Sequence, residues 1–203
     1  ECIFMSGAPD LEILQETPQI SSEDFNEKTG LSESFVLVTF HPETHRSQEG
    51  NGKFLEVAEK FLLSLNQEIL ITAPCADPGA YLVFAMIERL QAKSNRVVYR
   101  ECLGAELFVN ALRFASSMIG NSSSGIIEAA SVQLPVINIG DRQAGRECAE
   151  NVIHSSYDFA ELIQAYTGLQ SPTFLVQCKK VNNPYGDGDF CVRFIEALSK
   201  ILI

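Results

Sequence analysis

The sequence has no apolar run long enough to cross a membrane. Its longest apolar stretches, such as residues 35–40, fall far short of the roughly 18 residues that a membrane-spanning helix needs. The opening residues 1–5 carry no basic region and no cleavage-site pattern, so we recognise no secretory signal and expect a cytoplasmic protein without a membrane partner. The chain does not begin with methionine, and we expect that a segment upstream has been removed or belongs elsewhere.

Basic residues are scarce, and the cysteines are not paired in sequence. Fifteen Lys and Arg residues stand against 26 Asp and Glu residues, which gives a formal net charge of -11. Because such a surface repels phosphate polymers, we expect no nucleic-acid partner. The six cysteines are widely spaced and form no C-x-x-C pair, which excludes a zinc ribbon and a redox motif. We therefore expect reduced, mostly buried thiols and no metal site.

What is present is the composition of a folded domain: 46% hydrophobic and 20% charged residues in a chain of 203, enough for one large domain or for one domain and a fragment. From residue 35 onward, short β-rich runs alternate with segments of helical periodicity, which predicts an α/β fold with a Rossmann-like, doubly wound parallel sheet. We expect strands at 35–40, 69–73, 96–99, 117–119, 135–139 and 152–154. We expect helices at 53–65, 81–90 and 105–114, and an amphipathic terminal helix at 189–203.

The first 34 residues have a different pattern. Residues 6–9 predict a turn, 10–15 a short helix, and 16–28 a polar linker that has room for one more helix. We therefore assign residues 1–34 to the end of a preceding domain and a linker, and residues 35–203 to the main domain. Within the main domain, Asp77 and Pro78 predict a helix start, with Asp as N-cap and Pro at the first helical position.

Ligands of open α/β sheets bind beyond the carboxyl ends of the strands, and a turn of small residues, 120–128, follows the fourth predicted strand. Its main-chain N–H groups and serine hydroxyls at a helix start favour a bound phosphate. The glycine spacing is that of a P-loop, but Ile126 and Ile127 replace the Lys and Ser/Thr that a P-loop needs, and no G-x-G-x-x-G supports a nicotinamide cofactor. A capped turn without any ligand is the alternative.

Arg142 follows the next predicted strand, where a guanidinium can bind phosphate oxygens in bidentate fashion. A partner in an ordinary salt bridge is an equally good interpretation of this residue. Near the chain's end, residues 183–188 form a cluster of turn residues, which on physical grounds alone indicates the entry to a helix.

His41 follows the first predicted strand, and Pro42 keeps it extended. The spacing to His45 does not make a zinc protease, because Pro42 opposes the helix that H-E-x-x-H needs. A zinc deaminase signature is also incomplete, since Pro78 occupies the place of the second cysteine after Cys75. Whether His41 is functional or structural stays open on these residues alone.

Taken together and in this order, residues 41–44 (His-Pro-Glu-Thr), 120–128, 135–152 and 183–188 resemble one family, the hydrolysing UDP-N-acetylglucosamine 2-epimerases of sialic-acid and related nonulosonic-acid biosynthesis. The sister branch, which keeps UDP on its product, typically has His-Arg-Arg-Glu-Asn after the first strand and Asp-Ser-Gly-Gly at the phosphate site. This chain has neither motif, which favours the hydrolysing branch.

The resemblance implies a GT-B architecture of two Rossmann-like domains, of which this chain is similar to the C-terminal, UDP-binding one. By motif position, the diphosphate would contact Ser122, Ser123 and Arg142, the ribose Glu128, the uracil the Leu103 backbone, and His41 would aid departure of UDP. The implied reaction eliminates UDP from UDP-GlcNAc and adds water to give N-acetylmannosamine, without a cofactor. Its acid/base carboxylates lie on the N-terminal domain, so the chain alone would be inactive.

The resemblance implies as partners UDP or UDP-GlcNAc, the N-terminal epimerase domain, and in some cases a second copy of the chain. One departure stands at Cys75, where the family usually has an asparagine thought to lie by the nucleotide, and a thiol is a weaker hydrogen-bonding group. Two alternatives remain: a noncatalytic nucleotide-sugar-binding domain, and the donor-binding half of a GT-B glycosyltransferase.

Overall fold

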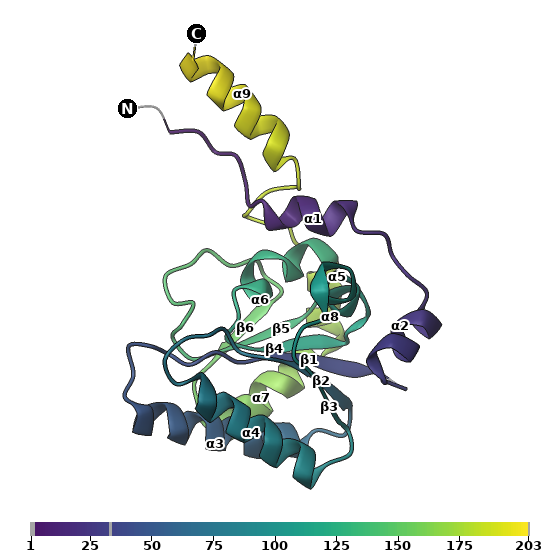
Figure 1. The fold of residues 1–203 in the computed structure, drawn as a ribbon, viewed down its shortest axis with the longest axis vertical. Helices are drawn as coiled ribbons and strands as arrows, with labels where there is room; N and C mark the ends of the chain where they lie inside the picture. The colour runs from purple at the N-terminus through teal and green to yellow at the C-terminus, as the bar shows by residue number, and fades with distance from the viewer. Residues whose placement is uncertain (1–2, 33, 203) are drawn as a thin grey trace.

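The protein is built around a six-stranded sheet, and the computed structural model describes residues 3–32 and 34–202 (Figure 1). The strands are β1 (Phe35–Thr39), β2 (Glu68–Thr72), β3 (Val97–Arg100), β4 (Ser117–Gly120), β5 (Val136–Ile139) and β6 (Val152–Ser155). They lie in the order β3-β2-β1-β4-β5-β6, and every neighbouring pair is parallel. The order reverses direction between β1 and β4, so a ligand crevice is expected beyond the carboxyl ends of these two strands.

The central strand shows why both faces of the sheet are covered. Every residue of β1 is buried, as expected of a parallel strand between two helical layers. Val36 and Val38 join one hydrophobic cluster, and Phe35 and Leu37 join another, because successive side chains point to opposite faces. The alternation of β1 thus divides the core into two layers.

The helices are distributed over both faces (Figure 1). The first cluster is built with apolar residues of α3 (Gln48–Ser64), α4 (Ala80–Lys93) and α7 (Phe159–Leu169). The second is built with α1 (Asp10–Glu16), α2 (Ser22–Thr29), α5 (Gly104–Phe114) and the 3-10 helix η1 (Ala129–Val132), which follows α6 (Ser124–Ile127). Helix α8 (Pro172–Cys178) follows α7, and Phe174 packs on the first cluster. The N-terminal segment therefore covers part of the sheet.

Helix α9 (Phe190–Leu202) extends away from the sheet, beside the N-terminal segment (Figure 1). Most of its large apolar side chains are exposed, Ile195 to 61%, and among the α9 side chains that the structure describes only Ala197 is buried. No helix in the described residues 3–32 and 34–202 is long and apolar enough to span a membrane.

The six predicted strands and the α/β class are confirmed, with ends that differ by about one residue. The helix start predicted at Asp77 and Pro78 is wrong: Ala80 begins α4, and the Ala80 N–H bonds to the Asp77 carbonyl in a preceding turn. Gly79 in this turn has φ +94° and passes close to the Pro42 side chain, so the chain must clear Pro42 before the helix begins.

Two helices, α7 and α8, lie where the sequence analysis placed none. Their start signals are nevertheless present, since the Asp158 carboxylate accepts from the N–H groups of Ala160 and Glu161, and Ser171 caps a helix that begins with Pro172. Helix α3 begins five residues before the predicted start, because Ser47 caps it.

The prediction of mostly buried thiols is wrong for the described part of the chain. The cysteines described there are free, but only Cys178 is buried, whereas Cys75, Cys102 and Cys191 are exposed. Each exposed cysteine lies in a loop that follows a strand or on α9, outside the two hydrophobic clusters that cover the sheet.

Candidate functional site

The loops that follow β1, β4 and β5 are joined at the carboxyl edge of the sheet by one buried residue, Asn121, through its side chain and its main-chain carbonyl. Its Oδ1 accepts from the His41 N–H at 2.7 Å, and its Nδ2 donates to the His41 carbonyl at 2.8 Å. The Asn121 carbonyl accepts in turn from Gln143 Nε2 at 2.8 Å. His41 and the serine turn (residues 120–128) are thereby held side by side, because hydrogen bonds between buried polar groups fix the loops that carry them.

The Arg142 guanidinium lies over this network. Its Nη1 donates to the Asn121 carbonyl at 3.3 Å, and its side chain is about one quarter exposed. The Asp77 carboxylate is the acidic partner closest to it, but at 3.9 Å from Nη2 it is too far for a hydrogen bond. Arg142 therefore points into the edge of the sheet and keeps most of its N–H donors available, which favours a phosphate ligand over a salt-bridge role.

His41 is held in one tautomer. The Cys75 N–H donates to its Nδ1 at 2.9 Å, and a main-chain N–H can only donate, so Nδ1 carries no proton and Nε2 does. Burial, together with the positive charge of Arg142, lowers the pKa of His41 from 6.5 to about 4, although Asp77 acts in the opposite direction. At neutral pH the residue is therefore an uncharged imidazole that donates from Nε2.

The turn after β4 offers unpaired main-chain donors. Gly120 has φ +146° and lies so close to the Thr39 carbonyl that a side chain would overlap it, which lets the chain turn sharply at the strand end. In the part of the chain that the structure describes, no acceptor bonds to the N–H groups of Ser122 or Ser123. The next N–H group along the turn, that of Ser124, is the first after them to have an acceptor. Free N–H groups at such a turn attract anions.

Glu128 and Leu103 lie apart from this network. Glu128 accepts from Ser124 Oγ at 3.2 Å, and burial, with Asp10 as a second cause, raises the pKa of its carboxyl. Leu103 is buried in the second hydrophobic cluster and immediately precedes α5, three residues beyond the end of β3. Within residues 3–32 and 34–202, no hydrogen bond or ion pair joins either residue to His41 or Arg142. The Asn121 bonds thus bring His41 and Arg142 to the start of the turn that carries Ser122 and Ser123, and the ligand contacts of all six residues stay predictions.

Two buried residues of the site were not singled out from the sequence, Asn121 and Glu43. Both lie inside the motifs, but their roles depend on loops that meet only in the folded chain. One signal for Glu43 was present in the sequence: it is a carboxylate close behind an apolar strand, and a carboxylate is rarely buried unless it has a partner. The structure buries it completely, with the Tyr157 hydroxyl 2.8 Å from Oε1.

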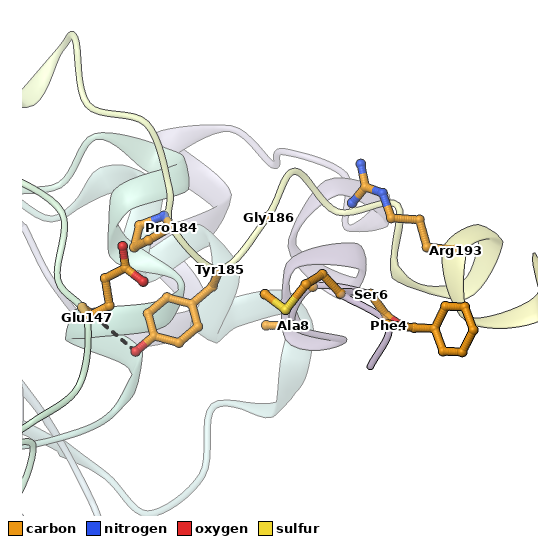
Figure 2. A pocket seen from close by; sticks show the side chains of 10 residues that line it. Phe4, Ser6, Ala8, Glu147, Pro184, Tyr185, Gly186 and Arg193 are labelled. Carbon is orange, nitrogen blue, oxygen red and sulfur yellow. Dashed lines mark hydrogen bonds between the residues drawn. The ribbon is translucent and has the colours of Figure 1, made fainter. Parts of the chain in front are cut away.

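The turn at 183–188 links the serine turn to the N-terminal segment. Asn183 Nδ2 donates to the Ile127 carbonyl at 2.7 Å, and the Ala8 N–H donates to the Tyr185 carbonyl at 2.8 Å. Figure 2 shows Tyr185 beside Ala8, with its hydroxyl bonded to the Glu147 carbonyl. A cavity of about 610 Å³ lies here, lined by residues 4–8, 184–186, Glu147 and Arg193, away from the network of His41 and Arg142.

The sheet is parallel and doubly wound, and the serine turn with its free N–H groups and the Arg142 side chain lie at the point where the strand order reverses. These features define the class of Rossmann-like nucleotide-binding domains. Residues 1–199 match the family described as UDP-N-acetylglucosamine 2-epimerase, and the chain belongs to this family. The expected α/β fold of the GT-B type is confirmed by solved structures. The chain resembles a UDP-GlcNAc 2-epimerase of Neisseria meningitidis bound to UDP-GlcNAc, with a TM-score of 0.75 at 18% identity, covering 96% of this chain and 54% of that one.

Curated relatives include two hydrolysing enzymes. The chain is 31% identical over 204 residues to UDP-N,N'-diacetylbacillosamine 2-epimerase of Legionella pneumophila, covering 99% of this chain and 52% of the relative. It is 32% identical over 145 residues to GDP/UDP-N,N'-diacetylbacillosamine 2-epimerase of Campylobacter jejuni, covering 71% and 37%. The chain thus spans about half the length, or less, of the curated relatives it matches.

Proposed function

We propose that this chain is the UDP-binding half of a hydrolysing UDP-N-acetylglucosamine 2-epimerase. The observation that carries the proposal is the Arg142 guanidinium, held inward at the sheet edge beside the free N–H groups of Ser122 and Ser123. Fixed main-chain N–H donors beside a guanidinium, which can donate two parallel hydrogen bonds, suit the two phosphoryl groups of a sugar nucleotide. Membership of the UDP-N-acetylglucosamine 2-epimerase family supports UDP as the ligand of these donors.

The rest of the nucleotide is assigned by motif position. The Glu128 carboxylate binds the ribose hydroxyls, and the Leu103 main chain binds the uracil. Leu103 lies beyond β3 and Glu128 beyond β4, at the same carboxyl edge as Arg142, which is compatible with one extended ligand along that edge. These two contacts depend on the family resemblance, whereas the diphosphate contacts also have the geometry described above.

His41 acts in the reaction as an uncharged hydrogen-bond donor. Because Cys75 occupies Nδ1, the proton available to a substrate is the one on Nε2. A neutral imidazole gives up that proton only at very high pH, so His41 stabilises negative charge on the departing diphosphate and does not transfer a proton to it. The same use of a neutral histidine with a lowered pKa is known from triosephosphate isomerase.

The chemistry at the sugar needs a second half. UDP leaves by elimination, in which a base removes the proton at C2 and the C1–O bond breaks to give 2-acetamidoglucal and UDP. Water then adds across the double bond, with its oxygen at C1 and a proton at C2, to give N-acetylmannosamine. Both steps need carboxylates that the family carries on its N-terminal domain. The chain alone is therefore expected to bind UDP without turnover.

The surface for that second half is the exposed apolar end of the molecule. Ile3 and Met5 are exposed to 87% and 84%. The N-terminal segment runs beside α9 (Figure 1), whose Phe194, Ile195 and Ile201 are also exposed. Exposed apolar patches of this kind mark contacts with a partner. Since the chain spans about half of its relatives, the partner we assign is the N-terminal epimerase domain, and self-association through this face is expected without it.

Thermal unfolding with and without UDP tests the proposal. UDP at about 100 times its dissociation constant stabilises a protein that binds it by roughly 2.7 kcal/mol, and uridine, which lacks the diphosphate, serves as the control ligand. UDP is common to the N-acetylglucosamine and diacetylbacillosamine substrates in the relatives' names, so the result does not depend on the sugar. A folded chain that UDP leaves unchanged contradicts the proposal.

A further inference from the structure

The Glu43 carboxylate is completely buried beneath the site and connects three loops. It belongs to the loop after β1, while its partners belong to the loops after β5 and β6, so it reaches past β4, the strand that carries the serine turn. Oε1 accepts from the Tyr157 hydroxyl at 2.8 Å and from the Asp141 N–H at 3.1 Å. A buried carboxylate is costly unless its oxygens are satisfied in this way.

The other oxygen holds the loop after β1 together. Oε2 accepts from Arg46 Nε, and His45 Nε2 lies 3.6 Å away. Arg46 also bonds to the Asp141 carboxylate at 2.9 Å, so Asp141 is bound to the Glu43 loop through both its main chain and its side chain. Asp141 immediately precedes Arg142. The position of the Asp141 main chain therefore determines where the Arg142 side chain leaves the main chain.

Tyr157 fixes the other side of the same loop. Its ring stacks on Phe54 with centroids 4.1 Å apart, and burial, followed by the charge of Glu43, raises the pKa of its hydroxyl, which therefore remains a donor. Gly140 has φ +77° and packs so closely against Tyr157 and Glu43 that a methyl group there would overlap both. The Gly140–Asp141 main chain thus lies directly on the Glu43–Tyr157 pair.

We propose that the hydrogen-bonded pair of Glu43 and Tyr157 is a positioning device for Arg142. By holding Gly140 and Asp141, the pair fixes the position of the Arg142 guanidinium relative to the diphosphate. The side chains of Glu43 and Tyr157 themselves do not touch the nucleotide. The inference depends on the proposed function, because it assigns the pair a role in UDP binding. A purely structural role, in which the pair only stabilises the loop after β1, is the alternative that the experiment must separate.

A double-mutant cycle on the intact chain makes this separation. Tyr157→Phe removes the hydroxyl and keeps the stacked ring, and Arg142→Ala removes the group that we infer is positioned. UDP affinity is measured by calorimetric titration for the unaltered chain, both single variants and the double variant. Tyr166→Phe is the matched control, because the Tyr166 hydroxyl bonds to Gln67 just before β2, at the opposite end of the sheet.

Tyr157→Phe is expected to weaken UDP binding about five- to tenfold in the unaltered background and less than about twofold in the Arg142→Ala background, because coupled residues are not additive. Exchange of the Asp141 amide, which bonds to Glu43, is expected to speed up in Tyr157→Phe and not in Tyr166→Phe. Equal losses in both backgrounds, or no loss in either, would overturn the inference.

Failure of the proposed function gives a different result. If the unaltered, folded chain does not bind UDP, the proposed function and the role assigned to the pair are both rejected; if it binds and the losses are additive, only the pair's role is rejected. Should Tyr157→Phe not fold, Glu43→Gln replaces it in the same cycle. If neither variant folds, the pair supports the fold itself and the inference is overturned.

Discussion

The carboxyl edge of the sheet and the end that carries α9 treat their side chains in opposite ways. At the sheet edge, polar groups such as Asn121 and Glu43 are fully buried and bonded to partners from other loops. At the α9 end, large apolar groups such as Ile195 and Met5 are exposed, and the cavity between the N-terminal segment and the 183–188 turn opens there.

The difference shows which part of the site the chain completes by itself. Buried hydrogen bonds of Asn121 and Glu43 tie the loops of the sheet edge together, so the phosphate side of the site is organised before any ligand arrives. Exposed apolar area of the α9 type is unfavourable until another surface covers it. In the isolated chain, we therefore expect UDP to bind at the sheet edge. At the α9 end, we expect self-association that increases with protein concentration.

The largest effect is expected at the sheet edge from Arg142→Ala. Losing a guanidinium that binds phosphate oxygens costs about 3 kcal/mol, or roughly a hundredfold in UDP affinity. Arg142→Lys keeps the charge but not the fork, and an intermediate loss is expected. Calorimetric titration with UDP measures both. Arg89→Ala, which removes one of the two cations bonded to the buried Glu59 and leaves Lys93 in place, is the control; a similar loss there would mean that the affinity reflects overall charge.

The opposite response is expected from Ile195→Glu on α9. Because Ile195 is exposed in the isolated chain, the free energy of unfolding changes by less than about 0.5 kcal/mol. Self-association through the apolar face weakens by about 2 kcal/mol, since a charge replaces buried apolar area in the contact. Sedimentation equilibrium measures this, with Lys200→Glu on the same helix as the control. An unchanged association constant would show that α9 is not the contact.

The pH dependence of stability is a test of the sheet edge alone, because His41 lies there. The His41 imidazole has a pKa of about 4 in the folded chain against 6.5 for the free side chain, so the unfolded chain binds more protons between these values. Stability therefore falls as the pH drops from about 6.5 to about 4. The loss attributed to His41 is about 1.5 kcal/mol, less than the full shift would give, because the partly exposed Arg142 is screened by solvent.

His41→Asn tests this assignment because an asparagine oxygen accepts from the Cys75 N–H and does not titrate. The variant is expected to flatten the slope of denaturant-derived stability between pH 4 and 6.5, whereas His154→Asn, at an exposed position on β6, leaves it. Nitrogen shifts of the imidazoles report the tautomer directly, and a proton on Nδ1 of His41 would contradict the assignment.

Much of the fold could be predicted from the sequence because it depends on local patterns. The runs that became β1 and β5 are short, apolar and bounded by turn residues, and their spacing from helical segments indicated parallel pairing. The positions of His41, Ser122 and Arg142 followed from one further rule, that residues after parallel strands meet at one edge. Their grouping in the structure is a consequence of the topology.

The remaining features depend on contacts between loops that no local pattern encodes. The Asn121 side chain pairs with the main chain of His41, eighty residues away, and Glu43 is buried because Tyr157 and Asp141 reach it across β4. The turn before α4 failed to follow its Asp-Pro signal because Pro42 lies against it. Such pairings become visible only when the strand order brings the loops together.

The smallest effect tests the departure that the family resemblance implies at Cys75. The Cys75 main-chain N–H already holds His41, so replacing its exposed thiol with the usual asparagine leaves that bond in place and adds a carboxamide beside the proposed nucleotide. Cys75→Asn is expected to strengthen UDP binding about threefold, or about 0.7 kcal/mol, the size of one modest hydrogen bond. Cys191→Asn makes the same change on α9, where no effect on UDP is expected. An equal gain from both variants, or a loss from Cys75→Asn, would mean that the thiol position does not face the nucleotide.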